Sequence, residues 1–283
     1  MRRAKKLFLI SLTVLFVLQS GISAPALALD YITSAAPVTI TNDVFTMTIP
    51  ADVPYPTNIE SLILAYCNWV QEASGLSFFP PGTAYENIIM RITNDGGAYA
   101  YGGAFGINVA NMDYLLDAAG AEFAYLHELT HVLQFRLINI DCPPFTEAFA
   151  ILNSAKAAKA QGLVYLYWHL MSFNYAYVDP STEEAIISSD FETFYRTNED
   201  GWDDYLYGFR FGVYLETVYG ADIFTTIIQN HAAAFGTRAL TRNEFVDFLL
   251  TQTNVDVFIN FAEWYWQNKD LFEMKPEPPR FYP

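Results

Sequence analysis

One stretch of the sequence has residue types and spacing suited to binding a metal ion. Residues 124–134, Ala-Tyr-Leu-His-Glu-Leu-Thr-His-Val-Leu-Gln, place His127-Glu128-x-x-His131 within an apolar pattern typical of a helix. Residues four apart on a helix lie on one face, one turn apart, so both imidazoles can bind the same ion. Glu128 then lies beside the ion, where a general base for a water molecule has to be. The pattern therefore predicts a zinc site with its own base.

A third metal ligand is expected at the start of the next helix. Asp141-Cys-Pro-Pro144 interrupts the chain after the histidines, and Phe145-Thr-Glu147 begins a new helical pattern. Catalytic zinc sites use three protein ligands and keep one position open, so Glu147 would complete a set of two histidines and one glutamate. The helix dipole also favours an acid in a first turn, but that role leaves the histidines without a third ligand. We therefore expect Glu147 to bind the ion.

These residues resemble those of the gluzincins, the zinc metallopeptidases of the thermolysin and aminopeptidase N kind, and more closely the compact bacterial proteins with a peptidase MA-like domain. The resemblance covers roughly residues 38–235. It rests on residues 127–134, on Glu147 in a Pro-Pro-x-x-Glu helix start, and on a later pattern, Tyr205-x-x-Gly208-x-x-Phe211-x-x-Tyr214-Leu215-x-x-x-Tyr219-Gly220. It implies an α+β, zincin-like fold.

The resemblance also implies roles for individual residues. One Zn²⁺ would be held by three of them, His127, His131 and Glu147. Glu128 would activate the water, and Tyr205 would donate to the oxyanion that develops on the scissile carbonyl. Tyr207 is the rival for that role, and His231 is a more distant alternative that we otherwise expect to be a surface histidine at a helix end. His169, within a Tyr-Trp-His run, is expected to pack among aromatic side chains.

The sequence departs from the family around the third ligand. The tryptophan and glycine that often flank this ligand in the family are here Pro144 and Ala148, and no acid lies four or five positions after Glu147 to orient a zinc histidine. We expect Asn153, or a residue elsewhere in the fold, to orient the histidine instead. Such outer partners set the tautomer and the affinity of metal ligands, so this departure concerns affinity for zinc more than geometry.

A strand over residues 104–110 precedes the zinc helix, as the substrate-lining edge strand does in the family. A substrate peptide would then add to this strand by backbone hydrogen bonds at Ala104, Phe105 and Gly106. The alternative is an ordinary edge strand that binds no peptide.

The elements needed to position these residues divide the chain into a mixed N-terminal third and a helical remainder. In the first we expect a hairpin over 38–49 that turns at Asn42-Asp43, a helix from the capping box Thr57-x-x-Glu60 to Gly75, a strand over 87–93, a turn over 94–97 and the strand over 104–110. In the second we expect helices near 119–137, 145–160, 163–171, 182–195, 204–219, 222–234, 242–251 and 255–268, with capping boxes at Ser181-x-x-Glu184 and Thr241-x-x-Glu244 and a stop at Gly220.

The predicted organisation follows from these elements. We expect a signal peptide over 1–28, an α+β subdomain over 29–137 that ends in the zinc helix, a helical C-terminal subdomain over 138–274, and a flexible tail over 275–283. The first 28 residues carry four basic side chains and then a twelve-residue apolar run, which is too short to span a bilayer, before an Ala-x-Ala site. The protein is therefore expected to be secreted, with the metal in the cleft between the two subdomains.

The net charge limits which molecules the protein can bind, and the cysteine content limits its disulfides. Of 15 basic residues, removal of the signal takes four and leaves 11 against 31 acidic residues, a net charge of −20. Such a chain repels nucleic acid and anionic membranes, so neither is expected as a partner. The acidic segment 198–204 would be either a Ca²⁺ loop or a solvated turn, and we expect the turn. Cys67 and Cys142 could form one disulfide in an exported chain.

The sequence thus predicts a secreted, monomeric zinc metallopeptidase that acts on a peptide or protein substrate through a zinc-activated water. Two alternatives remain open at this point. One is a catalytically inactive extracellular binding module that keeps the zincin fold, although the presence of Glu128 disfavours it. The other is a zinc amidase that acts on cell-wall peptides with the same metal ligands.

Overall fold

The structure, a computed structural model, describes residues 30–80, 86–93, 98–101, 103–108, 121–171, 183–184, 187, 191–197, 201–236, 238–253 and 256–273. The predicted signal peptide, the turn at 94–97, Ser181 and the tail over 275–283 lie outside these residues. Within them, no helix is both long and apolar enough to span a bilayer. The fold is α+β, as predicted, with a mixed sheet near the N-terminus and helices in most of the remainder.

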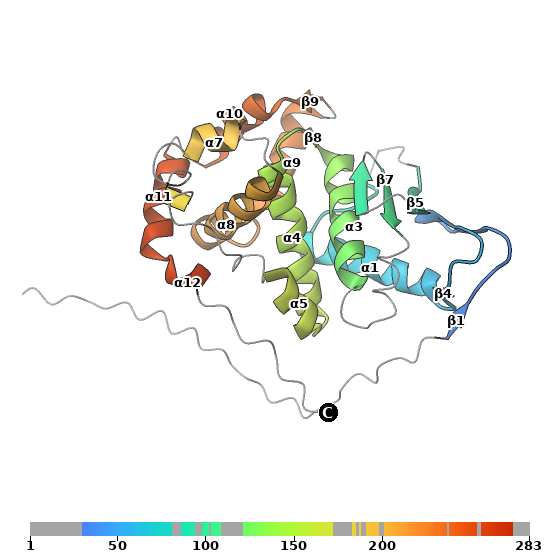
Figure 1. Cartoon of the computed structure of the whole chain (residues 1–283). Coiled ribbons are helices and arrows are strands. Elements are labelled where there is room, and N and C mark those ends of the chain that lie inside the picture. Colours follow the sequence, from blue (N-terminus) through green and yellow to red (C-terminus); the bar gives the residue numbers. More distant parts are fainter. Residues whose placement is uncertain are drawn as a thin grey trace, which may run out of the picture.

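The main sheet has five strands, which lie at one end of the molecule (Figure 1). At the other end lie the helices α7 (Phe191–Thr197), α10 (Arg242–Gln252), α11 (Val257–Gln267) and α12 (Asp270–Glu273). The strands of the main sheet are β2 (Val38–Thr41), β3 (Phe45–Ile49), β5 (Ile88–Thr93), β6 (Ala98–Tyr101) and β7 (Ala104–Asn108), in the spatial order β2-β3-β5-β7-β6. The β3–β5 and β5–β7 pairs are parallel, and the two outer pairs are antiparallel. The predicted hairpin at Asn42-Asp43 is confirmed, because β2 and β3 pair across it.

Two further strand pairs are short. β1 (Tyr31–Ile32) pairs with β4 (Tyr55–Pro56), and β8 (Asn139–Ile140) pairs in parallel with β9 (Ala239–Leu240). The second pair joins the end of the zinc helix to a segment about 100 residues later in the chain.

The prediction that Ala104, Phe105 and Gly106 lie on an edge strand is wrong. They belong to β7, which pairs with β5 on one side and with β6 on the other, so its backbone groups are already used by the sheet. The strand over 98–101 is not expected from the sequence, because this Ala-Tyr-Ala-Tyr run is short and follows a glycine-rich segment. β6 is the strand at this edge of the sheet.

Helix α1 (Ile59–Ser74) packs against the two helices that carry His127, His131 and Glu147. The start of α1 differs from the prediction, and its end agrees with it. The helix begins after Asn58 without a side-chain cap, so the capping box at Thr57 is wrong. Glu60, its expected partner, instead accepts a hydrogen bond of 3.0 Å from the Asn42 side chain. The C-terminal end is as predicted, because Gly75 has a left-handed φ of 67° and donates its N–H to the Gln71 carbonyl at 2.8 Å.

Helices form most of the rest of the described chain. They are α3 (Ala121–Leu137), α4 (Pro143–Ala160), α5 (Val164–Met171), α7 (Phe191–Thr197), α8 (Gly201–Tyr219), α9 (Ile223–Phe235), α10 (Arg242–Gln252), α11 (Val257–Gln267) and α12 (Asp270–Glu273). The capping box Thr241-x-x-Glu244 at the start of α10 is confirmed. The predicted turn over 198–204 is wrong for 201–204, which form the first turn of α8, and 198–200 lie outside the described residues.

A buried ion pair attaches α8 to the C-terminal helices. Arg210 is 3% exposed, and its Nη1 atom lies 3.0 Å from Glu183 Oε1 and 2.6 Å from the Tyr265 hydroxyl of α11. The Tyr265 hydroxyl also donates to Glu183, and Lys269 lies 2.8 Å from the second oxygen of that carboxylate. Because each charge has a partner, the group can be buried at the centre of the helical part.

A close backbone contact joins α4 and α8, which lie side by side in the middle of the molecule (Figure 1). A Cβ atom at Gly208 would lie 2.6 Å from the Cα atom of Pro144, so only glycine allows this approach. At the other end of the contact, Lys156 of α4 lies 2.6 Å from Glu216 and donates to the Ala221 carbonyl beyond the end of α8. These contacts fix α8 against the first turn of α4.

Gly208→Ala is expected to destabilise the protein by about 1–3 kcal/mol, because the added methyl group meets backbone atoms of Pro144 that cannot move aside. The matched control is Gly212→Ala on the same helix, where the added Cβ would lie 2.9 Å from Leu152 Cδ1, 3.0 Å from Ala148 Cβ and 3.2 Å from Phe224 Cζ, all of them side-chain atoms. Its destabilisation should be smaller than that of Gly208→Ala, because no backbone atom is in the way and alanine gains about 0.5–1 kcal/mol of helix propensity. Urea unfolding of both variants checks the order, and equal stabilities would contradict the contact.

Candidate metal centre

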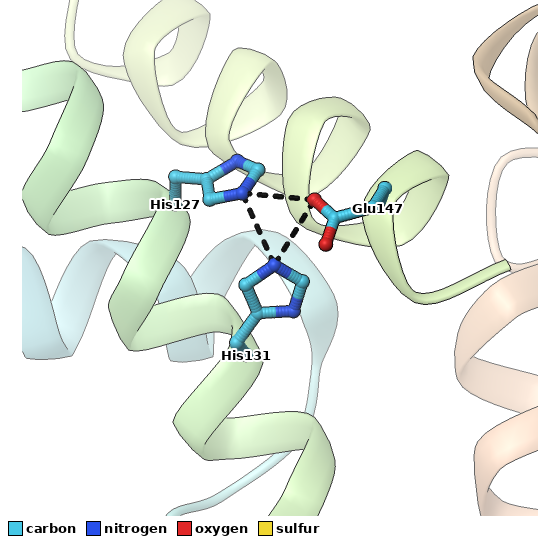
Figure 2. Close-up of side chains that lie close together, drawn as sticks. All are labelled: His127, His131 and Glu147. Carbon is cyan, nitrogen blue, oxygen red and sulfur yellow. Dashed lines mark hydrogen bonds and ion pairs between the residues drawn. The ribbon is translucent and has the colours of Figure 1, made fainter. Parts of the chain in front are cut away.

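Three side chains of types that bind metal ions meet where α3 packs on α4 (Figure 2). His127 and His131 project from successive turns of α3 and turn their Nε2 atoms toward the carboxylate of Glu147, in the second turn of α4. The two Nε2 atoms are 3.1 Å apart, and Glu147 Oε2 lies 3.1 Å from the first and 3.2 Å from the second. The structure therefore brings together the three ligands expected from the sequence.

The donor set and its spacing fit a single zinc ion. Ligand atoms about 2.05 Å from a tetrahedral ion lie roughly 3.3 Å from one another, which is within a few tenths of an ångström of the observed separations. Two imidazole nitrogens and one carboxylate oxygen form the three-ligand set that leaves a position open for a reactant. Both histidines are buried, so their Nε2 atoms face each other in a place with little water.

The rigid position of the histidines follows from the burial of the helix that carries them. Leu126, Leu129, Val132 and Leu133 of α3 are completely buried in the core. Asn153 of α4 adds a polar link, because its Nδ2 atom donates to the Val70 carbonyl of α1 and to Thr130 Oγ1 of α3, both at 3.2 Å. The expectation that Asn153 orients a zinc histidine is not met, since these bonds join three helices instead.

The charges of the cluster support one another. Burial raises the pKa of Glu147, but the charge of His131 and hydrogen bonds from both imidazoles outweigh it, so the pKa is lowered. Burial lowers the pKa of His131, but the charge and hydrogen bond of Glu147 outweigh it, with smaller contributions from Glu128 and Gln134, so the pKa is raised. Glu147 thus favours the protonated form of His131, and a cation that binds this site has to compete with that proton.

Glu128 lies in the same site but in a different environment. It is 5% exposed, and burial raises its pKa; the two histidines lower it and Glu147 raises it, with a net upward shift. Its Oε2 atom has no hydrogen-bond partner among the described residues. A buried carboxylate with a raised pKa and an unused oxygen is suited to accept a proton near neutral pH and return it.

Of the two tyrosines proposed for the oxyanion, the structure places Tyr205 at the site. Burial raises its pKa, and so do the charge and hydrogen bonding of Glu147 and the charge of Glu128, which puts the hydroxyl close to both carboxylates. Tyr207 is completely buried elsewhere, packed edge-on against Phe194 with ring centroids 5.7 Å apart and lying 5.5 Å from the Arg210 guanidinium. Gly208, one turn after Tyr205, makes the backbone contact that sets this position.

The other candidates take no part in the site. His231, expected at the surface, is completely buried in α9 and packs against Phe235 and Phe248, with ring centroids 5.2 and 5.6 Å away. The prediction is wrong because α10 covers this face of α9. The side chain of His169 lies outside the described residues. Cys67 and Cys142 are both buried and are not joined in a disulfide.

Comparisons with known proteins give only distant similarity. No protein-family model matches the chain, and no curated protein does. Among solved structures, the chain is similar to an M1 zinc metallopeptidase from Deinococcus radiodurans, with 15% identity, a TM-score of 0.48, and coverage of 90% of this chain and 54% of that one. It is also similar to native leukotriene A4 hydrolase from Saccharomyces cerevisiae, with 14% identity, a TM-score of 0.48 and coverage of 90% and 46%. The chain spans about half the length of each.

Zinc binding is expected to weaken as the pH falls. Because the pKa of His131 is raised, a proton competes with zinc at higher pH than at an ordinary histidine; affinity should be greatest above the raised pKa and decrease as the pH falls through it. Chelator competition between about pH 8.5 and about pH 5.5 measures this dependence.

The control is Glu147→Ala, which removes a ligand and should lose high-affinity zinc across the whole range. A parent affinity that does not change with pH, or a variant that binds zinc as tightly as the parent, would contradict the assignment of these ligands.

Proposed function

We propose that the protein is a zinc-dependent hydrolase of peptide bonds, with Glu128 as the general base. The observation that carries the proposal is the meeting of His127, His131 and Glu147 beside a second buried carboxylate that has an unused oxygen. Structural sites tend to use all their donors, whereas this group offers three ligands and keeps a base next to them.

The roles of the residues follow from their environments. Zinc, when bound by the two histidines and Glu147, would polarise the scissile carbonyl and lower the pKa of a water molecule to about 7. Glu128, close enough to interact with both histidines, would take the proton from that water and pass it to the leaving amine. Tyr205, whose pKa is raised, stays protonated and donates its hydroxyl hydrogen to the developing oxyanion.

A substrate peptide would bind in extended form along β6. This strand is at the edge of the sheet and packs against α3, which carries the histidines. Its partner on the inner side is β7, so an added strand would pair on the outer side. Export through the signal at residues 1–28 would place the protein outside the cell, where its acidic surface favours solubility.

Glu128→Gln is expected to keep zinc and lose turnover by several orders of magnitude, because it removes the base and leaves the ligands. The measurement is cleavage of a fluorogenic peptide library by the zinc-loaded chain, beside zinc content by mass spectrometry. Turnover equal to that of the parent would refute the mechanism. If the parent cleaves no peptide of the library but releases amino groups from cell-wall peptides, the protein is a zinc amidase whose substrates are cell-wall peptides.

Tyr205→Phe is expected to slow cleavage roughly 10- to 1,000-fold without loss of zinc, because only the hydroxyl that donates to the oxyanion is removed. Tyr207→Phe is the matched control, since it removes the same atom from a tyrosine of the same helix that packs against Phe194. The assignment fails if the control loses more activity than Tyr205→Phe, measured as kcat on the same peptide.

A further inference from the structure

Besides Glu128 Oε2, two polar groups that are buried beside the metal centre lack a hydrogen-bond partner in the described part of the chain. One is the Nδ1 atom of His131, on the side of the ring away from the cluster; the other is the whole side-chain amide of Gln134. Gln134 lies three residues after His131 on α3, so the two side chains share one face of the helix. Gln134 is 0% exposed.

An amide buried without a partner is unfavourable, so its position calls for an explanation. A histidine that binds a metal through Nε2 carries its proton on Nδ1 and requires an acceptor there. The Oε1 atom of Gln134 is an acceptor of that kind, one turn away.

Other groups around His131 do not provide this acceptor. Glu147 faces the Nε2 side of the ring, and the Nδ2 atom of Asn153 is used by Val70 and Thr130; the Oδ1 atom of Asn153 also has no partner among the described residues, but Asn153 lies on α4, whereas Gln134 lies one turn from His131 on the same helix. Phe135 stacks on the His131 ring at an interplanar angle of 8°, with centroids 5.6 Å apart, which restrains the plane of the ring but not a 180° flip about the Cβ–Cγ bond that would exchange Nε2 with a carbon atom. A hydrogen bond at Nδ1 would restrain that remaining freedom.

We propose that Gln134 is a positioning residue, which accepts the Nδ1–H of His131 and so holds this ring in the tautomer and orientation that present Nε2 to zinc. The proposal rests on the proposed function only through the metal centre, not through the substrate. It also answers the departure noted in the sequence, where no acid follows Glu147 to orient a histidine. The acceptor comes instead from the helix of the histidines themselves.

The test uses the full mature chain and three substitutions. Gln134→Met removes the acceptor and nearly keeps the volume, and should weaken zinc binding about 10- to 100-fold in chelator competition. Gln134→Glu keeps an acceptor, so it should bind zinc at least as tightly as the parent protein does, in contrast to Gln134→Met. Asn153→Leu is the control, because it removes a buried amide of α4 that bonds to Val70 and Thr130, and it should lower stability with little change in zinc affinity.

The second readout is independent of activity and of whether Gln134→Met folds. Selective ¹⁵N labelling of the four histidines should show, in the zinc-loaded parent, a His131 Nδ1–H that exchanges slowly with water and lies close to the Gln134 side chain. A rapidly exchanging Nδ1–H in the parent, or a Gln134→Met variant with parental zinc affinity, would overturn the proposal. A parent that binds zinc with this signal but cleaves no peptide would refute the proposed function alone.

Discussion

The main constraint on this structure is that two imidazoles and two carboxylates must stay close together where little water can reach them. Each group alone would be unfavourable there, because burial opposes the charged form of either type. His127, His131 and Glu147 offset this cost by facing one another at hydrogen-bonding distance across the α3–α4 contact. The fixed packing of these two helices on α1, through apolar side chains and the Asn153 bonds, keeps the cluster from relaxing.

The two glutamates of the site differ because of their neighbours and not because of their depth. Both are largely buried, yet the pKa of Glu147 is lowered and that of Glu128 is raised. Although burial raises both, Glu147 accepts hydrogen bonds from the imidazoles, whereas Glu128 only experiences their charge at a distance. Opposite pKa shifts in two adjacent carboxylates are a usual sign of different chemical roles, and they agree with the ligand and base roles proposed for Glu147 and Glu128.

How far the sequence could predict the structure depended on how local each signal was. The approach of His127 and His131 follows from a spacing of four on one helix, and the end of α1 follows from one glycine that accepts a left-handed conformation. The bond from Asn42 that removed Glu60 from its capping box joins segments 18 residues apart, and the burial of His231 depends on a helix that comes later in the chain. Such contacts leave no periodic pattern in the residues that make them. The sequence assigns no role to Gln134, which is only the last residue of the segment that contains the histidines. Its spacing does not show which neighbouring side chains lack a hydrogen-bond partner.

The approach of Gly208 to Pro144 has a mechanical consequence for the site. Pro144 and Glu147 lie within one turn of α4, and Gly208 and Tyr205 lie within one turn of α8. The Gly208–Pro144 contact therefore connects Glu147 to Tyr205 through about one turn of rigid helix on each side. Because Lys156 also binds Glu216 near the C-terminal end of α8, this helix is attached to α4 at two separate places. Tyr205 is therefore held near Glu147 by contacts that lie outside the metal centre itself.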